Sequence, residues 1–407
     1  MREAILIIGG GLLQIPAVRI AKDMGFVVVM TDASPDAPAM QLADEPIVLD
    51  IFDVKGHQEL VGSLMKRYNL RGVFTEGADV EVTVAAAAET ANLPGIQVES
   101  AFNTKNKQRM RQCFDQAGIP NPKWKEVRSV EEGIAASQKI GFPLMVKAVD
   151  NCGSRGTTRV EQESQLQDAI PWAQNNSTTG TALLEECFQG MEQSVEILFE
   201  STTSCHRLNI VDRPFQTDGA YAIELGHVNP TRLDHPVQRQ LFDLTERAAA
   251  ACGIRFGVFK ADTIVTPAGP RILEVTARLS GGFDSQYTTP LSSGRNFIRA
   301  AMRLAVGLPL DPSDLEKKCS RYAAAWAAFP TPGLVDSIEN VDHVRNLPGI
   351  KEIFLRVKEG DVIQPYTTCV ARPAFVIAVG ETYDDAVRYA QQGARALRIE
   401  TSPLVPA

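Results

Sequence analysis

Two lysines and two acidic residues in the middle of the chain have the types and the spacing needed to bind a polyphosphate and a divalent cation. Lys107 begins a helix-like segment and Lys147 ends an apolar strand-like run, so the two ammonium groups come from separate elements. Asp262 and Glu274 lie twelve residues apart, on two strand-like runs joined by a short turn. Lysines on separate elements can grip phosphate oxygens, and carboxylates on one face of a hairpin can hold Mg²⁺, a hard cation that prefers oxygen ligands.

A polar loop that contains glycine, Cys152-Gly-Ser-Arg-Gly156, follows the strand-like run that ends at Lys147. Gly153, Ser154 and Gly156 would let backbone N–H groups close over phosphate oxygens, because glycine allows the backbone to approach a ligand closely. The same composition is also typical of an ordinary flexible turn. The loop is therefore a candidate phosphate-binding segment beside the second lysine.

A second glycine loop, Gly9-Gly-Gly11, comes directly after an apolar run, and Asp32 follows the next run. This order is found in dinucleotide-binding folds, in which the acid binds a ribose. The third glycine of that fingerprint is missing, because the loop continues as Leu-Leu-Gln14. We interpret the loop as a tight strand-to-helix turn, and a nicotinamide- or flavin-dependent oxidoreductase is an alternative that rests on this loop alone.

A third motif, Ser280-Gly-Gly-Phe-Asp-Ser285, matches the phosphate loop of ATP pyrophosphatases. Such a loop needs a strand directly before it and a helix directly after it, so that backbone N–H groups face the phosphate. The motif lies late in the chain and Pro290 follows soon after it, so we interpret the match as coincidental.

Strand-like and helix-like segments alternate at the start of the chain and predict a parallel sheet covered on both faces. The continuous apolar runs at 4–8 and 26–31 are typical of buried parallel strands. The other segments expected here are helices at 16–24, 57–68 and 80–92 and strands at 47–49 and 72–75. The fold class expected is therefore α/β, with a Rossmann-like domain at about 1–100.

The remaining chain also mixes strands and helices. The expected helices cover 107–117, 236–252 and 382–396, and the expected strands cover 143–148, 181–185, 193–199, 257–265, 270–276, 353–357 and 374–379. Residues 212–229 are loop-rich, and a change of pattern near 309–318 indicates a domain boundary.

Composition excludes several classes of protein. The 407 residues contain 41 Lys and Arg against 49 Asp and Glu, a net charge of −8 that argues against a nucleic-acid partner. The seven cysteines include no C-x-x-C pair, which argues against a zinc site and favours a reducing compartment. Neither a signal sequence nor a run of 18 apolar residues occurs, so we expect a cytoplasmic protein without a membrane partner.

Taken in order, the segments around the two lysines and the two acids resemble the ATP-grasp superfamily over about 1–310. They are the helix from Lys107 to Gly118-Ile-Pro-Asn-Pro122, Pro143-Leu-Met-Val-Lys147, Cys152–Gly156, Leu184–Glu192, Phe256–Asp262 and Ile272–Arg278. The resemblance implies an ATP-grasp domain at 101–310, with a small lobe at about 115–190. It also implies a C-terminal α+β domain at 311–407 that closes the site.

The resemblance implies the following ATP contacts. Lys107 and Lys147 match the two lysines that hold the phosphates. The end of the strand at Glu185 and Glu186 matches the hinge whose backbone binds adenine, with Phe188 supplying a backbone N–H there. Glu192 matches the acid that binds the ribose hydroxyls.

The resemblance also implies a metal site and a catalytic arginine. Asp262 and Glu274 match the carboxylates that bind Mg²⁺, with Mn²⁺ as an alternative cation, and Arg278 matches the arginine that stabilises an acyl phosphate and the later oxyanion. The family usually has Asn where this chain has Thr276, whose hydroxyl can ligate a metal or hold a water molecule. This departure puts a second metal ion in question.

Two further segments resemble the L-amino acid (dipeptide) ligase branch. Glu224-Leu-Gly-His227 matches an E-x-x-H segment beside the substrate, and Leu279-Ser-Gly-Gly282 matches the continuation that places Gly281 and Gly282 at the substrate. The C-terminal part resembles both this branch and biotin carboxylases. Glu76, before the helix at 80–92, is a candidate for the border of the acceptor site.

The function expected is an ATP-dependent ligase. A small carboxylate would become an acyl phosphate and then an amide with an amine, with Glu224 binding or deprotonating the amine and His227 steadying the oxyanion. The alternatives are a carboxylase-type ligase that uses bicarbonate and a nucleotide-binding regulatory module without turnover. Since relatives commonly dimerise, a homodimer is an open expectation.

Overall fold

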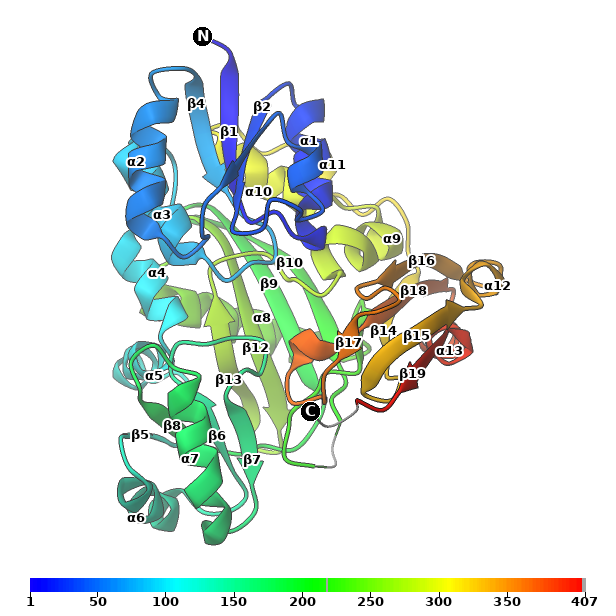
Figure 1. Cartoon of the computed structure of the whole chain (residues 1–407). Helices are drawn as coiled ribbons and strands as arrows, with labels where there is room; N and C mark the ends of the chain where they lie inside the picture. Colours follow the sequence, from blue (N-terminus) through cyan, green and yellow to red (C-terminus); the bar gives the residue numbers. More distant parts are fainter. Residues whose placement is uncertain (217–218, 405–407) are drawn as a thin grey trace.

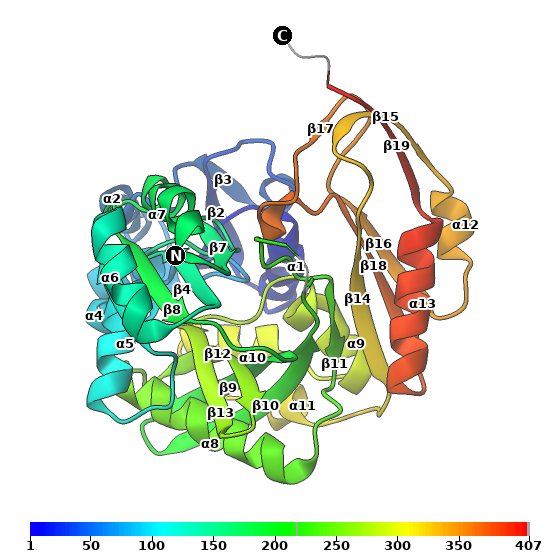
Figure 2. The ribbon, with the colours of Figure 1, turned by 90° about the horizontal axis from the view of Figure 1, so that it is seen from below.

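The computed structural model describes residues 1–216 and 219–404. Within them the strands form one parallel sheet near the N-terminus, two largely antiparallel sheets in the middle of the chain and a small sheet near the C-terminus (Figure 1). Seen from below, the small lobe around α6 and β8 and the C-terminal unit around β18 lie on opposite sides of the central strands β9, β10 and β12 (Figure 2).

The N-terminal sheet has the strand order β3-β2-β1-β4, and its pairs are parallel. Its elements are β1 (Glu3–Ile8), α1 (Ile15–Asp23), β2 (Val27–Asp32), β3 (Glu45–Val48), α2 (Val54–Leu64), β4 (Asn69–Phe74) and α3 (Glu81–Thr90). Alternate residues of β1 face opposite cores: Ile5 and Ile7 pack with α1, and Leu6 and Ile8 pack with α2 and α3. The prediction of a parallel sheet buried on both faces is confirmed.

The small lobe is an antiparallel sheet of order β5-β8-β6-β7 with two helices against it. Its elements are β5 (Trp124–Val127), α6 (Val130–Ile140), β6 (Leu144–Ala148), β7 (Thr157–Val160), α7 (Leu166–Asn175) and β8 (Ala182–Glu186). Two helices, α4 (Val98–Lys105) and α5 (Lys107–Gln116), connect it to the N-terminal unit. The apolar strand that ends near Lys147 is therefore a central strand of the lobe.

The largest sheet has the order β13-β12-β9-β10-β11-β14-β18-β16. The elements of this sheet and its helices are β9 (Glu192–Ser201), β10 (Ser204–Arg213), β11 (Gly226–Asn229), α8 (His235–Ala251), β12 (Gly257–Thr266), β13 (Gly269–Thr276), β14 (Tyr322–Ala328), β16 (Ile350–Leu355), β18 (Ala374–Gly380) and α13 (Tyr383–Ala396). The segment that looked loop-rich contains the end of β10 and all of β11, because short strands there carry polar residues. Strand β14 pairs with β11, so hydrogen bonds cross the boundary expected near 309–318.

Smaller elements complete the chain. They are a π-helical turn (Asp284–Thr288), α9 (Thr289–Ser293), α10 (Phe297–Ala305), α11 (Pro312–Leu315), β15 (Gly333–Glu339), α12 (Val341–Arg345), β17 (Val362–Ile363), a 3-10 turn (Cys369–Ala371) and β19 (Arg398–Ser402). Helix α10 packs against α1 in one hydrophobic core, so the N-terminal unit is fixed to the segment that follows β13.

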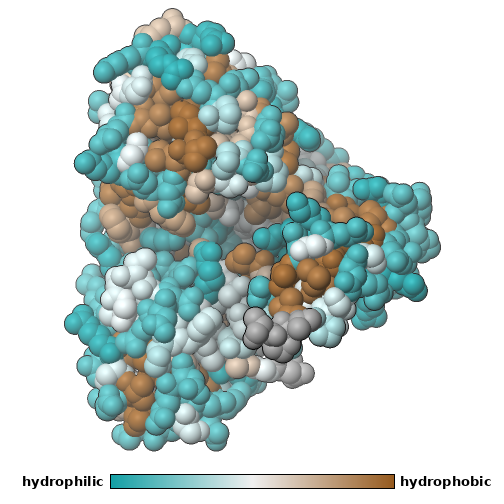
Figure 3. All heavy atoms as spheres, viewed as in Figure 1, coloured by the Kyte–Doolittle hydropathy of each residue, from teal (hydrophilic) through white to brown (hydrophobic). Residues whose placement is uncertain are grey.

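The surface carries both hydrophilic and apolar areas. Hydrophilic side chains cover most of the small lobe, and apolar residues gather over the N-terminal unit and the C-terminal unit (Figure 3). Within the described residues, no helix combines the length and the hydropathy needed to cross a bilayer.

Candidate active site

A cavity of about 610 Å³ collects most of the residues singled out from the sequence. Its walls come from the loop after β4, the loop between β6 and β7, the connection from β8 to β9, the hairpin β12–β13 and the turn Cys369–Ala371. Among the residues expected in the site, Glu76 and Gly156 do not line this cavity, and all others do. The fold therefore brings together segments that are up to about 290 residues apart, from Asp79 to Cys369.

Both expected phosphate lysines reach the cavity and are held by carboxylates. Lys107, at the start of α5, places Nζ 2.9 Å from an Oε of Glu274 and donates a hydrogen bond to the carbonyl of Asn151. Lys147, on β6, places Nζ 2.7 Å from an Oε of Glu185. Burial lowers the pKa of Lys107, but the Glu274 carboxylate more than offsets it, so this lysine remains charged.

Glu185 is almost completely buried and lies between two cations. Arg111 donates to it from Nε at 2.7 Å, and Lys147 contacts its other oxygen. Burial raises the pKa of Glu185, but the two cations outweigh burial and hold the pKa at about 2. Sequence reasoning missed Arg111, although it lies four residues after Lys107 on the same helix and so shares its face. The Glu185 side chain thus orients Lys147.

The glycine loop approaches the C-terminal unit. Ser154 Oγ lies 3.4 Å from the Cys369 sulfur, and the backbone N–H of Cys369 donates to the carbonyl of Gly153. Gly156 has φ +69°, and an added Cβ would meet Asn176 Cβ at 2.6 Å. Gly156 is therefore required by the packing of the loop on the lobe, while Gly153 and Ser154 line the cavity.

The connection from β8 to β9 forms one wall. Glu186 and Phe188 line the cavity there, next to Glu192 at the start of β9. Burial raises the pKa of Glu192 to about 7, although the Arg213 guanidinium lies 3.6 Å away. These are the residues that the resemblance assigns to the adenine and the ribose.

Asp262 on β12 and Glu274 on β13 are directly opposite in the register, so their side chains share one face of the hairpin. Thr276 lies two residues further along this face, and its Oγ1 is buried without a hydrogen-bond partner. In the described chain, no three His, Cys, Asp or Glu side chains form a metal-binding group on their own. Two carboxylates with an unpartnered hydroxyl fit Mg²⁺, which commonly takes few protein oxygens and completes its shell with phosphates and water.

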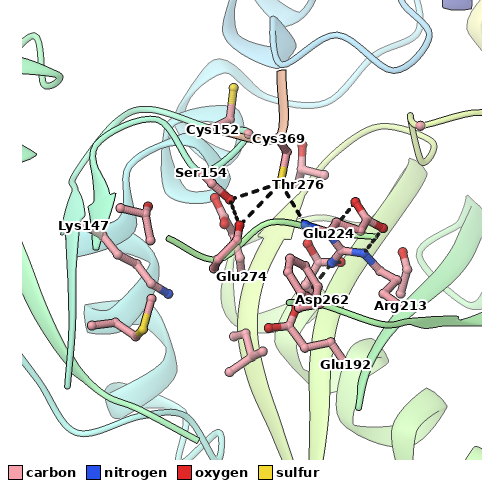
Figure 4. A pocket seen from close by; sticks show the side chains of 18 of the residues that line it. Lys147, Cys152, Ser154, Glu192, Arg213, Glu224, Asp262, Glu274, Thr276 and Cys369 are labelled. Atoms are coloured by element: carbon pink, nitrogen blue, oxygen red, sulfur yellow. Dashed lines mark hydrogen bonds and ion pairs between the residues drawn. The ribbon is translucent and has the colours of Figure 1, made fainter. Parts of the chain in front are cut away.

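Arg213, at the end of β10, links three of the acids (Figure 4). It lies 2.7 Å from Asp262, 3.0 Å from Glu224 and 3.6 Å from Glu192. Lys260 also contacts Asp262, at 2.6 Å. Burial lowers the pKa of Arg213, but the surrounding carboxylates raise it well above its usual value. Sequence reasoning missed Arg213, since no motif marks the end of that strand.

Glu224 is neutralised from two sides. Besides Arg213, Arg372 of the C-terminal unit lies 3.6 Å from its carboxylate and donates to its backbone carbonyl at 3.0 Å. Burial raises the pKa of Glu224, but the two guanidinium groups hold it at about 2. His227 is buried within hydrogen-bond distance of Thr288, and burial lowers its pKa to about 4, so the imidazole is neutral near pH 7.

Arg278 is anchored by the N-terminal unit. Its Nη2 lies 2.5 Å and its Nε 2.9 Å from an Oδ of Asp79, in the loop between β4 and α3. Gly281 passes so close to this loop that an added Cβ would lie 3.3 Å from the carbonyl of Gly77, and Gly282 borders His227. Glu76 is fully buried behind this wall and accepts a hydrogen bond from Gln286. The carboxyl end of β4 therefore shapes the site, as is common in parallel sheets.

Both remaining glycine motifs have structural roles. Asp32 accepts hydrogen bonds from the backbone N–H groups of Gly10 and Ser34, at 2.7 and 2.9 Å, so its carboxylate holds the turn after β1. The backbone N–H of Ser280 donates to Glu196 at 2.6 Å and is not directed at a phosphate. These contacts support the interpretations of a tight turn and of a coincidental match.

Two regions of the chain match known protein families, and a curated relative aligns over nearly the whole chain. Residues 140–286 match the ATP-grasp domain family, and residues 325–402 match the L-amino acid ligase C-terminal domain 2 family. The chain is 22% identical over 405 residues to a formate-dependent phosphoribosylglycinamide formyltransferase from Burkholderia pseudomallei, covering 97% of this chain and 95% of that protein.

Two solved structures share the fold. The L-amino acid ligase from Bacillus licheniformis aligns with a TM-score of 0.83 at 22% identity, covering 99% of this chain and 100% of that chain. The biotin carboxylase domain dimer of Hydrogenobacter thermophilus 2-oxoglutarate carboxylase, in complex with MgADP and bicarbonate, aligns with a TM-score of 0.73 at 18% identity over 97% and 90% of the chains. The overall fold expected from the resemblance is thus confirmed.

Proposed function

This chain carries an ATP-grasp domain followed by an L-amino acid ligase C-terminal domain, and we propose that it is an ATP-dependent ligase that joins a small carboxylate to an amine. The observation that supports this most strongly is the convergence in one cavity of Lys107 and Lys147, the Asp262–Glu274 pair and Arg278. Cations for a polyphosphate, oxygens for its metal and an arginine for developing negative charge are the groups that phosphoryl transfer to a carboxylate requires.

In this proposal ATP lies between the small lobe and the hairpin β12–β13. Lys107 and Lys147 hold its phosphates, and the glycine loop covers them with backbone N–H groups. The connection after Glu186 takes the adenine, and Glu192 takes the ribose. Glu185 orients the ammonium group of Lys147, and a second ion pair with Arg111 holds the Glu185 side chain in place.

Asp262, Glu274 and Thr276 would hold Mg²⁺, and Mn²⁺ offers the same oxygen-ligand chemistry. When bound there, the ion would supply positive charge that offsets the negative charge of the phosphoryl group during transfer. Lys107 and Lys260, which contact these carboxylates, limit repulsion between the acids before the ion binds.

The proposed reaction has two steps. An oxygen of the carboxylate substrate attacks the γ-phosphorus and the P–O bond to ADP breaks, which leaves an acyl phosphate. The nitrogen of the neutral amine then attacks the carbonyl carbon, the C–O bond to phosphate breaks, and the departing phosphate takes up the proton that the nitrogen loses. Arg278 and neutral His227 donate hydrogen bonds to the oxyanion formed in the second step, while the covered site excludes water.

The structure refines the proposed role of Glu224. A carboxylate with a pKa of about 2 that is already bound by two arginines is a weak base. We therefore assign Glu224 to orientation: it holds Arg213 and Arg372 in the wall of the cavity.

The test is a screen for ADP and phosphate release with ATP, Mg²⁺ and pairs of small carboxylates and amines, including amino acids and bicarbonate. We expect release to require both partners and mass spectrometry to find an amide. Lys147→Ala should lower turnover at least about a hundredfold, because a phosphate contact is lost. Lys139→Ala, an exposed lysine on α6, is the control and should leave turnover unchanged. Release that needs no amine, or full activity in Lys147→Ala, would contradict the proposal.

A further inference from the structure

Asp284 is a buried acid on the wall of the cavity with one oxygen unused. It begins the π-helical turn between β13 and α9, is 2% exposed and lines the cavity. Its Oδ1 accepts hydrogen bonds from Asn229, Thr288 and Thr289 at 3.0–3.1 Å. Its Oδ2 has no hydrogen-bond partner. All donors to this carboxylate are neutral.

Two more buried acids, Glu196 and Glu76, lie close enough to Asp284 to interact with it electrostatically. Glu196 is held by the Ser280 backbone and the Ser285 hydroxyl, and Glu76 by Gln286. Each also has one oxygen without a hydrogen-bond partner, but neither residue lines the cavity. Burial, and then the nearby Glu196, raise the pKa of Asp284 to about 7. A buried carboxylate that no cation contacts is stabilised most by a positively charged partner.

Glu224 lies in the opposite electrostatic environment, next to cations. Arg213 and Arg372 already neutralise it. An ammonium ion placed there would be repelled by two guanidinium groups, whereas one at Asp284 would meet a carboxyl group whose hydrogen-bond donors are all neutral and whose Oδ2 has no partner. His227, Gly281 and Gly282 line the cavity together with Asp284, and the two glycines add no side chain there.

We propose that Asp284 binds the amino group of the second substrate, which is therefore a small primary amine that arrives as an ammonium ion. This assignment rests on the proposed ligase function. Bound at Oδ2, the ammonium lies on the same side of the cavity as Arg278 and His227, which act on the acyl carbonyl. The site then selects amines over alcohols and thiols, because a neutral donor leaves the acidic group uncompensated.

The first experiment is a titration that needs no turnover. The protein is saturated with MgADP and titrated calorimetrically with methylammonium and with L-alaninamide; N-acetyl-L-alaninamide, which lacks the ammonium, is the neutral control. We expect wild type to bind the two cations and not the neutral compound. Asp284→Asn should weaken cation binding at least about tenfold, since it keeps the Oδ1 contacts and replaces the unpartnered oxygen by an amide N–H₂.

Two further variants distinguish a loss of cation binding from a loss of folding. Asp284→Ser removes the charge with a smaller side chain and should give the same loss, with melting curves reporting on both proteins. Asp314→Asn is the matched control, because Asp314 is also fully buried with an unpartnered Oδ2 but lies away from the cavity. It should bind the cations like wild type. Equal binding by wild type and both Asp284 variants, or no cation binding by wild type, overturns the assignment.

The second experiment uses the amine identified by the release screen. In Asp284→Asn the KM for the amine should rise at least about tenfold while the KM for ATP stays within about twofold, because the change lies away from the phosphates. An unchanged KM for the amine would overturn the assignment while leaving the ligase function standing. Failure of the ligase function itself appears separately, as release that needs no amine in wild type.

Discussion

At the scale of single residues, this site is dominated by charges that neutralise each other before any ligand binds. Lys147 with Glu185, Lys107 with Glu274 and Arg213 with its acids are all partly or fully buried. Burying a charge without a partner is costly, so each functional cation here needs a carboxylate to hold it in the cavity. Glu185 is the clearest case, because its only evident role is to orient other residues.

Glu185→Gln is predicted to destabilise the protein in a way that depends on pH. It leaves Arg111 and Lys147 without their anion, which costs about 3 kcal/mol in the free energy of unfolding at pH 7. The folded pKa is lowered from 4.5 to about 2, so the stabilisation is present above about pH 4.5 and is lost as the pH falls toward 2.

Urea unfolding of wild type and Glu185→Gln at pH 7 and pH 3 measures this difference. More than half of it should disappear at pH 3. Glu59→Gln, which changes an exposed acid on α2, is the control and should differ from wild type by less than about 0.5 kcal/mol. A difference of equal size at both pH values would show that the cations do not set the pKa of Glu185.

At the scale of elements, two short connections set the geometry of the proposed nucleotide end. The hairpin β12–β13 places Asp262 and Glu274 opposite each other by register alone. The loop between β6 and β7 depends on glycine conformations: Gly156 has φ +69° and no room for a side chain. The backbone N–H groups of this loop can face phosphates only while the loop packs against β6 and the end of α7.

Gly156→Ala is predicted to weaken ATP binding at least about fivefold, because the added Cβ forces the loop away from Asn176 and Ala148. Gly180→Ala is the matched control: Gly180 has φ +65° but no heavy atom within 4 Å of the added Cβ, so it suffers only the conformational cost. Titration with an ATP analogue should separate the two variants. Equal affinities would show that the packing of the loop does not govern nucleotide binding.

At the scale of the whole molecule, the cavity is complete only when three units meet. The N-terminal unit contributes Asp79, the ATP-grasp region contributes Arg278, and the C-terminal unit contributes Arg372 and Cys369. The shared hydrophobic core of α1 and α10 and the pairing of β11 with β14 hold these units together. The proposed substrate end therefore depends on contacts between units, and the glycine loop at the proposed nucleotide end also contacts the C-terminal unit through Cys369.

Asp79→Asn is predicted to lower kcat for amide formation at least about tenfold while ATP affinity stays within about twofold. The substitution removes the carboxylate that orients Arg278, and it leaves the largely buried guanidinium without its anion. Glu3→Gln is the control, since Glu3 pairs with Arg71 on the exposed side of the same unit. A parallel loss of ATP binding in Asp79→Asn would show that Asp79 acts on the nucleotide end instead.

The sequence by itself determined the parallel N-terminal sheet and most of the residues that line the proposed nucleotide end, because both depend on short-range patterns. Buried strands appear as apolar runs, and the spacing of Asp262, Glu274 and Thr276 within one hairpin predicts a shared face. Lys107 and Lys147 could be found because Lys107 begins a recognisable helix and Lys147 lies near the end of an apolar strand.

Only the tertiary structure brought together the residues of the proposed substrate end. Arg213, Arg372 and Asp284 come from different elements, and no spacing rule relates residues whose contact depends on how whole units pack. The same packing decided the charge of each acid: Glu224 lies between two guanidinium groups and is ionised, whereas Asp284 lies among acids and lacks a cation. The electrostatic environment of a buried group is a property of its neighbours in space, which the order of residues along the chain does not contain.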